Sequence, residues 1–261
     1  MDFGAPDLLF EQRGPIVWVT INRPQARNAM TFAMYDGLVR ICDSVDADPN
    51  TRVLVLIGAG DKAFVSGTDI SQFQTFTNAD DAIEYEKRVD AVIGRLESLQ
   101  RPSIAAISGY AVGGGASIAM ACDLRIGTAE TRMGVPISRT LGNCLSMANY
   151  ARLVDLIGPA KTKEIIFTGR MIESAEALAA GLLNEIVDLA DLPVRAEALA
   201  NQIALNAPIT IQVTKEAIRR VLVHRRPPKV DDLVLRAYQS NDFKEGVRAF
   251  LDKRKPQWTG T

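Results

Sequence analysis

The 261-residue sequence lacks the side chains on which several classes of site depend. Its three cysteines, Cys42, Cys122 and Cys144, lie far apart and outside any CxxC spacing, which argues against a disulfide framework and a thiolate metal site. A single histidine, His224, excludes a His-rich metal site and argues strongly against Ser-His-Asp catalysis. We therefore expect no bound metal.

The sequence also lacks a strong charge of either sign and a long apolar run. Its formal net charge of -1 argues against a nucleic-acid partner, because such binding depends on cations that neutralise phosphates. No apolar stretch reaches the roughly 18 residues of a membrane span, and the N-terminal residues lack the pattern of a secretory signal. We expect a soluble, cytoplasmic protein that does not enter a membrane.

The apolar residues of the first half predict an α/β core. Residues 15–21 and 53–57 are short, β-branched runs, as in strands inside a sheet, and residues 32–45 form an amphipathic helix behind the N-cap Thr31. A second helix is expected over residues 80–99. Three further elements, two strands around a short helix, are expected at residues 103–108, 114–121 and 123–127.

Helical patterns dominate from about residue 143. The expected elements are helices at residues 145–156, 160–167, 174–180, 210–223 and 231–254, with one strand at 185–187. The last two helices are charged on one face and apolar on the other, which suits packing on the body or on another subunit.

One glycine motif resembles a dinucleotide fingerprint. GAGDKA, residues 58–63, follows a predicted strand and fits the form G-x-G-x-x-A. A pyrophosphate site would need a helix to open at once, yet the next residues, FVSGTD, are poor helix formers. The pattern favours a turn after a strand over a dinucleotide site. The glycine triplet at 113–115 has no Lys-Ser/Thr pair after it, so it is not a P-loop.

Two other stretches predict a different use of backbone. AFVSGTDI, residues 63–70, and GYAVGGGASIA, residues 109–119, each bring small residues to the end of a strand. Two backbone N–H groups aimed at one oxygen form an oxyanion hole, which stabilises the enolate or tetrahedral oxyanion of a thioester. The N-terminus of the short helix adds its dipole, and glycine leaves room for the carbonyl.

At these residues the chain resembles the enoyl-CoA hydratase/isomerase (crotonase) superfamily. Five collinear stretches carry the resemblance: NRPQARNAM (22–30), DKAFVSGTDI (61–70), RPSIAAISGYAVGGGASIAMACDLRI (101–126), TGRMIESAEALAAGLLNEIV (168–187) and FKEGVRAFLDKRKPQW (243–258). The resemblance implies an α/β fold, a crotonase-like spiral of ββα units in residues 1–195, with a helical C-terminal trimerisation region in 196–261. It also implies a homotrimer or a dimer of trimers, an acyl-CoA thioester substrate, and no cofactor apart from the coenzyme A of that substrate.

The resemblance assigns roles to individual residues. It places the oxyanion-hole amides at Thr68 and Gly114. It places the groove for the CoA nucleotide and pantetheine at Gln25, Ala26, Arg27, Ser66, Asp69, Ile70 and Gly113. Arg27 suits such a role because a guanidinium binds phosphate bidentately. Lys244 and Phe250 are weaker candidates near the nucleotide, and the basic segment 215–229 either faces the CoA phosphates or is a solvated helix face.

The sequence departs from the family where hydration needs two glutamates around one water. The first position holds Ser117, and the second holds Ile137, or Ser138 after a shift of one residue. The serines are candidates to orient a water, but they are poor bases. Asp69, Glu84 and Tyr85 are substitutes for the missing acids, and Asp69 is expected to point into its turn. The sequence leaves open an enoyl-CoA hydratase or isomerase, a thioesterase or decarboxylase of the same fold, and a protein that only binds acyl-CoA.

Overall fold

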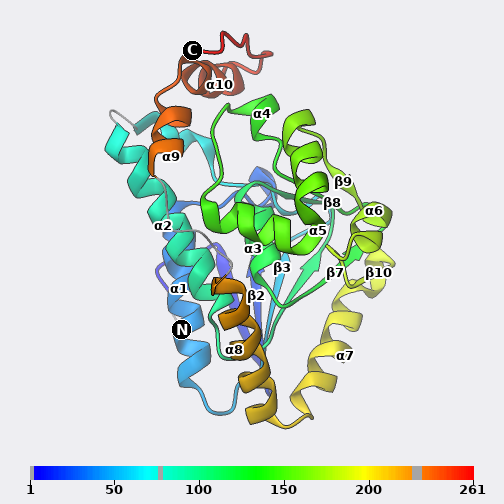
Figure 1. Ribbon diagram of the computed structural model, residues 1–261. Helices are drawn as coiled ribbons and strands as arrows, with labels where there is room; N and C mark the ends of the chain where they lie inside the picture. The colour runs from blue at the N-terminus through cyan, green and yellow to red at the C-terminus, as the bar shows by residue number, and fades with distance from the viewer. Residues whose placement is uncertain (1–2, 76–78, 225–230) are drawn as a thin grey trace.

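Six strands form the larger of two sheets in the computed structural model, which describes residues 3–75, 79–224 and 231–261 (Figure 1). The strands run in the order β1-β2-β3-β5-β7-β10, with β1 antiparallel to β2 and the other neighbours parallel. Their bounds are β1 Leu8–Arg13, β2 Ile16–Ile21, β3 Val53–Gly58, β5 Ser103–Ile107, β7 Leu124–Thr128 and β10 Glu185–Val187. The expected strands at 15–21, 53–57, 103–108, 123–127 and 185–187 are confirmed within one or two residues.

The smaller sheet has the order β4-β6-β8-β9. Its strands are short: β4 Ala63–Val65, β6 Tyr110–Val112, β8 Arg132–Gly134 and β9 Ile172–Glu173. The chain visits the larger sheet and then the smaller one three times, as β3 and β4, β5 and β6, and β7 and β8, and a helix follows each pair. This repeat matches the predicted succession of ββα units.

The helices surround these sheets (Figure 1). Their bounds are α1 Phe32–Ala47, α2 Ala79–Glu97, α3 Gly114–Ala121, α4 Ile137–Thr140, α5 Met147–Thr168, α6 Ser174–Ala179, α7 Leu192–Ala204, α8 Pro208–His224, α9 Asp231–Tyr238 and α10 Asn241–Leu251, with 3-10 turns at Pro24–Ala26, Ile70–Thr75 and Leu189–Asp191. The hydroxyl of Thr31 accepts a hydrogen bond from Met34 N, so it caps α1 as expected. Gly158, at φ 74°, kinks α5 where two separate helices were predicted.

Alternate residues of the central strands enter two cores. In β3, Val53 and Val55 pack with α7 on one face, whereas Leu54 and Leu56 face α1 and α2 on the other. Because side chains alternate across a strand, a sheet with helices on both faces needs continuous apolar runs. Burial of both faces is what holds the sheet rigid beneath the loops at its edge.

The C-terminal region differs from the prediction in one respect. The single helix expected over 231–254 is wrong: α9 ends at Tyr238, and α10 begins at Asn241. Ser240 has extended backbone, and its hydroxyl accepts a hydrogen bond from Phe243 N, which is the geometry of an N-cap.

The boundary proposed between residues 195 and 196 falls inside α7, which packs on the larger sheet. Figure 1 shows α9 beside α2 and α10 near the C-terminus.

The GAGDKA stretch forms no dinucleotide site. After β3 ends at Gly58, the chain turns and enters β4 without a helix. A Cβ atom at Gly58 would lie 2.5 Å from the carbonyl oxygens of Ala63 and Phe64, so glycine is needed for the close approach of two strands. The expected turn is confirmed. In the described part of the chain, no helix combines the length and the apolar character that crossing a membrane requires.

Candidate active site

Thr68 and Gly114 meet at the N-terminus of α3. A Cβ atom at Gly114 would lie 3.7 Å from Thr68 N, 3.3 Å from Thr68 Oγ1 and 2.3 Å from Tyr35 Oη. The last distance is below any tolerated contact, so only glycine fits here. Both residues line a cavity. The structure therefore brings the two predicted oxyanion donors together.

Both amides are left over from the local backbone pairing. Thr68 lies opposite Met30 in an isolated parallel β-bridge. The two hydrogen bonds of this bridge run from Met30 N to Gly67 O and from Asp69 N to Met30 O, each 2.9 Å long, and do not involve Thr68 N. Gly114 is the first residue of α3, where amides have no partner within the helix. In the described ranges, neither N–H donates to a protein acceptor. Gly113, the N-cap residue of this helix, has a positive φ of 54°, which glycine adopts without the strain that a side chain would cause.

Three hydroxyl groups lie beside the two amides. Thr68 Oγ1 is 2.9 Å from Tyr35 Oη on α1 and 2.8 Å from Tyr85 Oη on α2. Burial raises the pKa of Tyr35 to about 12 and that of Tyr85 well above its ordinary value, so both phenols stay protonated. These two hydrogen bonds hold the Thr68 loop between α1 and α2.

The cavity has a volume of about 160 Å³ and lies between the Thr68 loop, α2, α3 and the segment from α4 to α5. Six predicted site residues line it: Ser66, Thr68, Ile70, Gly113, Gly114 and Ser117. Phe250 of α10 also reaches its wall. The remaining wall is mostly apolar, with Phe73, Val89, Val112, Val135 and Leu141 among its residues.

The predicted nucleotide residues Gln25, Ala26 and Arg27 lie next to this cavity but do not line it. Ser66 links them to its edge, since Ser66 N donates to Arg27 O at 3.2 Å and Ser66 Oγ donates to Ala26 O at 3.4 Å. Gln25 and Arg27 are exposed. Asn28 fixes the same segment by donating to Ala59 O and Ala63 O.

Asp69 and Ser138 point elsewhere. Although burial acts to raise the Asp69 pKa, hydrogen bonds from Ser71 and Arg23 outweigh it and lower the pKa, so this carboxylate holds its turn as expected. Ser138 is exposed, and its hydroxyl donates to Ile166 O at 2.5 Å, outside the cavity. The structure does not bring Ser138 to the oxyanion donors.

The two positions at which the resemblance predicts the glutamates of hydration do face the cavity. Ser117 and Ile137 both line it. Ser117 is fully buried, and its hydroxyl donates to Gly113 O at 3.3 Å. Neither residue supplies a carboxylate, so the usual pair of acid and base is absent from these two positions.

A carboxyl group that the sequence analysis missed lies in the same cavity. Glu86 of α2 is the only acidic residue among the described residues of the lining. Burial raises its pKa to about 7; a hydrogen bond from Tyr238 Oη to Oε1, 2.5 Å long, acts to lower it, and the charge of Asp90 acts to raise it. A carboxyl poised near neutral pH in a cleft is suited to proton transfer.

The sequence carries a signal for Glu86. The buried stripe of α2 includes Ala82, Val89, Ile93 and Leu96, and position 86 continues the same helical spacing. A glutamate on an apolar stripe is costly to bury without a purpose or a partner. Of the two neighbours named from sequence, Tyr85 lines the cavity and Glu84 is exposed.

The thiol of Cys144 is unsuited to nucleophilic chemistry. It lines the cavity, where burial raises its pKa to about 12 and keeps it protonated. Nor do three metal-ligating side chains gather anywhere in the described ranges.

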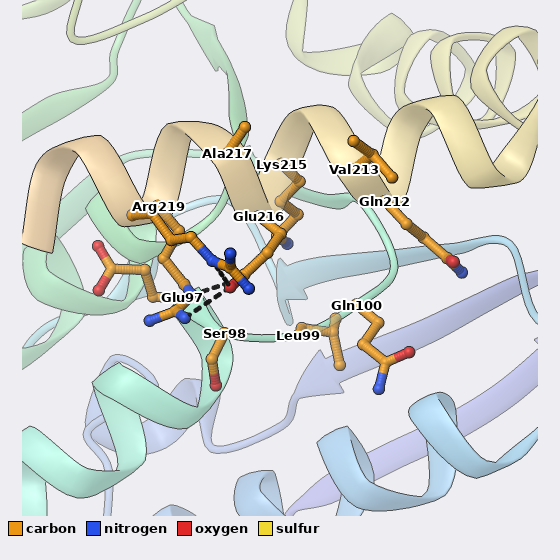
Figure 2. A pocket seen from close by; sticks show the side chains of 11 residues that line it. Glu97, Ser98, Leu99, Gln100, Gln212, Val213, Lys215, Glu216, Ala217 and Arg219 are labelled. Carbon is orange, nitrogen blue, oxygen red and sulfur yellow. Dashed lines mark hydrogen bonds and ion pairs between the residues drawn. The ribbon is translucent and has the colours of Figure 1, made fainter.

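A larger groove of about 940 Å³ lies between the end of α2 and α8 (Figure 2). Its charged side chains are engaged with protein groups: Glu216 pairs with Arg219 and Arg220, and Lys215 pairs with Asp123 at 2.6 Å. This part of the basic segment behaves as a solvated helix face, and residues 225–230 lie outside the described ranges. The smaller cavity, with its amides and buried carboxyl, is the candidate active site.

Comparisons with known proteins identify the relatives of this chain. The model of the family described as Enoyl-CoA hydratase/isomerase matches residues 11–261. The chain is 34% identical to a short-chain-enoyl-CoA hydratase of Clostridium acetobutylicum, over 95% of this chain and 96% of that protein. A solved enoyl-CoA hydratase/carnithine racemase of Magnetospirillum magneticum has 33% identity and a TM-score of 0.80, covering 100% of this chain and 97% of that one.

A solved methylmalonyl-CoA decarboxylase in complex with 2-nitronate-propionyl-CoA is also similar, with a TM-score of 0.89 and 25% identity over 97% of this chain and 98% of that one. These matches confirm the resemblance that the five sequence motifs indicated and the mixed α/β fold.

Proposed function

Since the chain belongs to the enoyl-CoA hydratase/isomerase family and is an enzyme of that family, we propose that it acts on the CoA thioester of an unsaturated acid. The thioester oxygen binds the backbone amides of Thr68 and Gly114. The reaction passes through an enolate whose negative charge those two donors stabilise. Coenzyme A enters only as part of the substrate.

The observation that carries this proposal is the pair of unused amides. An enolate concentrates charge on the oxygen that was the carbonyl, so donors fixed at that point stabilise the transition state more than the ground state. Each such donor is worth about 10²–10³ in rate. Gly114 adds the positive end of α3, whose first turn lies at the same place.

The surroundings fit the two ends of such a substrate. Apolar side chains such as Val89, Val112 and Leu141 wall the cavity, which suits a hydrocarbon acyl group. The exposed segment Gln25–Arg27 borders the cavity through Ser66, and we propose it for the pantetheine and nucleotide, with Arg27 facing phosphate. Asp69 supports this groove from within its turn through the pair with Arg23.

Hydration across the C2=C3 bond is the leading reaction, since several similar proteins are named as hydratases. A shift of the double bond is the second candidate, because Ser117 and Ile137 leave the cavity without the two carboxylates of the usual hydration. Thioester hydrolysis, decarboxylation and mere binding of acyl-CoA are not favoured by these relatives.

We further propose that residues 196–261 contribute to a homotrimer or a dimer of trimers. Helix α8 exposes several large apolar side chains, which a subunit contact would cover: Ile209, Val213, Ile218 and Val221. The cytoplasmic location stays a prediction from the sequence.

Incubation of the purified protein with crotonyl-CoA and with 3-hexenoyl-CoA tests this function. Mass spectrometry detects added water in the first case, and absorbance of the conjugated enoyl thioester detects the bond shift in the second. Turnover of either substrate supports the proposal. If both thioesters bind in calorimetry but neither is converted, the proposal that this cavity is an active site is wrong.

A further inference from the structure

We propose that Glu86 is the proton-transfer group of this active site and that Tyr238, from the C-terminal region, is its positioning residue. The inference rests on the proposed function, because it needs an enolate at Thr68 and Gly114. It assigns to residues of α2 and α9 the proton transfer that two glutamates, at the positions of Ser117 and Ile137, perform in hydratases of this family.

The geometry gives Glu86 access to the substrate. Glu86 lines the cavity that Thr68 and Gly114 also line, and no other acidic residue among the described residues does so. Tyr238 Oη donates to Glu86 Oε1 at 2.5 Å, and Asn143 Nδ2 donates to Tyr238 Oη at 3.2 Å. Two successive hydrogen bonds, from Asn143 to Tyr238 and from Tyr238 to Glu86, therefore fix the position of Glu86 Oε1.

The electrostatic surroundings of Glu86 disfavour the ionised form of its carboxyl group. In the described structure no cation pairs with Glu86, while burial and Asp90 both disfavour its charge. The titratable groups that act on it come from four helices and a loop: Tyr35, Tyr85, Asp90, Cys144, Tyr150 and Tyr238. The four phenols and the Cys144 thiol have raised pKa values and are neutral near pH 7. Asp90 receives a hydrogen bond from Ser146 Oγ.

One carboxyl suffices for either reaction. In hydration, the carboxylate takes a proton from water while the water oxygen bonds to C3. The C2=C3 electron pair then forms the enolate, and Glu86 returns the proton to C2. In the bond shift, the carboxylate takes a proton from C2 of a 3-enoyl thioester and returns it to C4. Both routes balance without a cofactor or a second base.

Asn143 allows Tyr238 to serve both protonation states of Glu86. When the carboxyl is ionised, Tyr238 donates to it. When the carboxyl is protonated, it can donate to Tyr238 Oη, and the phenol proton then needs another acceptor. Asn143 Oδ1 is buried and has no partner among the described residues, so a rotated Asn143 amide supplies that acceptor.

Glu86→Gln tests the proposal, since the amide keeps the size of the side chain and an acceptor for Tyr238 but cannot transfer a proton. We expect the kcat for crotonyl-CoA or 3-hexenoyl-CoA to fall by about 10²–10⁴, with the Kd for the thioester changed only a few fold. The matched control is Glu130→Gln, at an exposed turn between β7 and β8, which should keep wild-type kcat.

Tyr238→Phe tests the positioning role. Loss of the bond that favours the carboxylate should move the acidic limb of the kcat profile to higher pH, whereas a merely structural role would lower kcat without moving that limb. An active wild type with Glu86→Gln within threefold of it would overturn the role of Glu86 and leave the proposed function standing. A wild type inactive on both thioesters would overturn both.

Discussion

Tyr238 of α9 donates its hydroxyl to Oε1 of Glu86 of α2 across 152 positions of sequence. The bond connects α9 to the cavity that Thr68 and Gly114 also line. Tyr238 of α9 therefore contributes directly to the environment of the candidate active site.

The first prediction concerns stability against pH. The folded pKa of Glu86, about 7, lies above its ordinary 4.5, so the folded state binds the extra proton between these values. Its contribution to stability is complete below about pH 4.5 and is lost as pH rises through 7. Glu86→Gln should hence raise the free energy of unfolding at pH 8 by up to about 3 kcal/mol relative to wild type, and by little at pH 4.5.

Urea denaturation of both proteins at the two pH values measures this difference. Equal stability differences at pH 4.5 and pH 8 would contradict a raised pKa at Glu86. The measurement does not depend on catalysis.

A second prediction concerns Gly114. Replacement by alanine would set a Cβ atom 2.3 Å from Tyr35 Oη and push apart the Thr68 loop and α3. We expect kcat to fall by about 10²–10³, the worth of one misplaced donor. Steady-state kinetics checks it.

Gly94→Ala is the matched control for Gly114. Gly94 lies within α2, and a Cβ atom there meets nothing within 4 Å. Alanine should raise stability by about 0.5–1 kcal/mol and leave kcat unchanged. If Gly114→Ala retained full activity, the oxyanion assignment would be wrong.

The third prediction separates the side chain of Thr68 from its backbone. Thr68→Val removes the hydroxyl that bonds to Tyr35 and Tyr85 but keeps the amide and the shape. The free energy of unfolding should fall by about 1–3 kcal/mol, and kcat of the folded enzyme should fall less than in Gly114→Ala. Thr68→Ser should recover most of the stability in thermal denaturation; a serine variant as unstable as the valine one would argue against the hydroxyl chain.

A fourth prediction concerns Asn28, which is buried at φ 58°. Its side chain accepts from Arg23 N and donates to the carbonyls of Ala59 and Ala63, so alanine loses three hydrogen bonds and leaves two carbonyls short of a donor. The free energy of unfolding of Asn28→Ala should be lower than that of the wild type by about 3 kcal/mol or more. Asn206→Ala, at an exposed position, should stay within about 0.5 kcal/mol in the same denaturation experiment.

The fifth prediction addresses Ser138. Its hydroxyl donates to Ile166 O outside the cavity, so Ser138→Ala should change kcat less than twofold. A tenfold loss in the same assay would return Ser138 to the active site.

The sequence by itself determined five strands of the larger sheet, the family motifs and the two candidate backbone donors. β-branched runs and glycines act through local geometry, so residues 53–57 were identifiable as a strand, and Gly114 as the start of a helix, without knowledge of their neighbours. The absence of carboxylates at Ser117 and Ile137 was equally visible, because it depends only on position within a motif.

Only the tertiary structure decided which acidic residue lines the cavity. The raised pKa of Glu86 depends on its burial, and the hydrogen bond that opposes this rise comes from Tyr238, which is distant in sequence. The motif likewise could not show that Ser138 turns toward α5 while its neighbour Ile137 lines the cavity, since one residue of a short helix sets that direction. Desolvation and side-chain direction are properties of packed neighbours, and these are fixed only when the chain has folded.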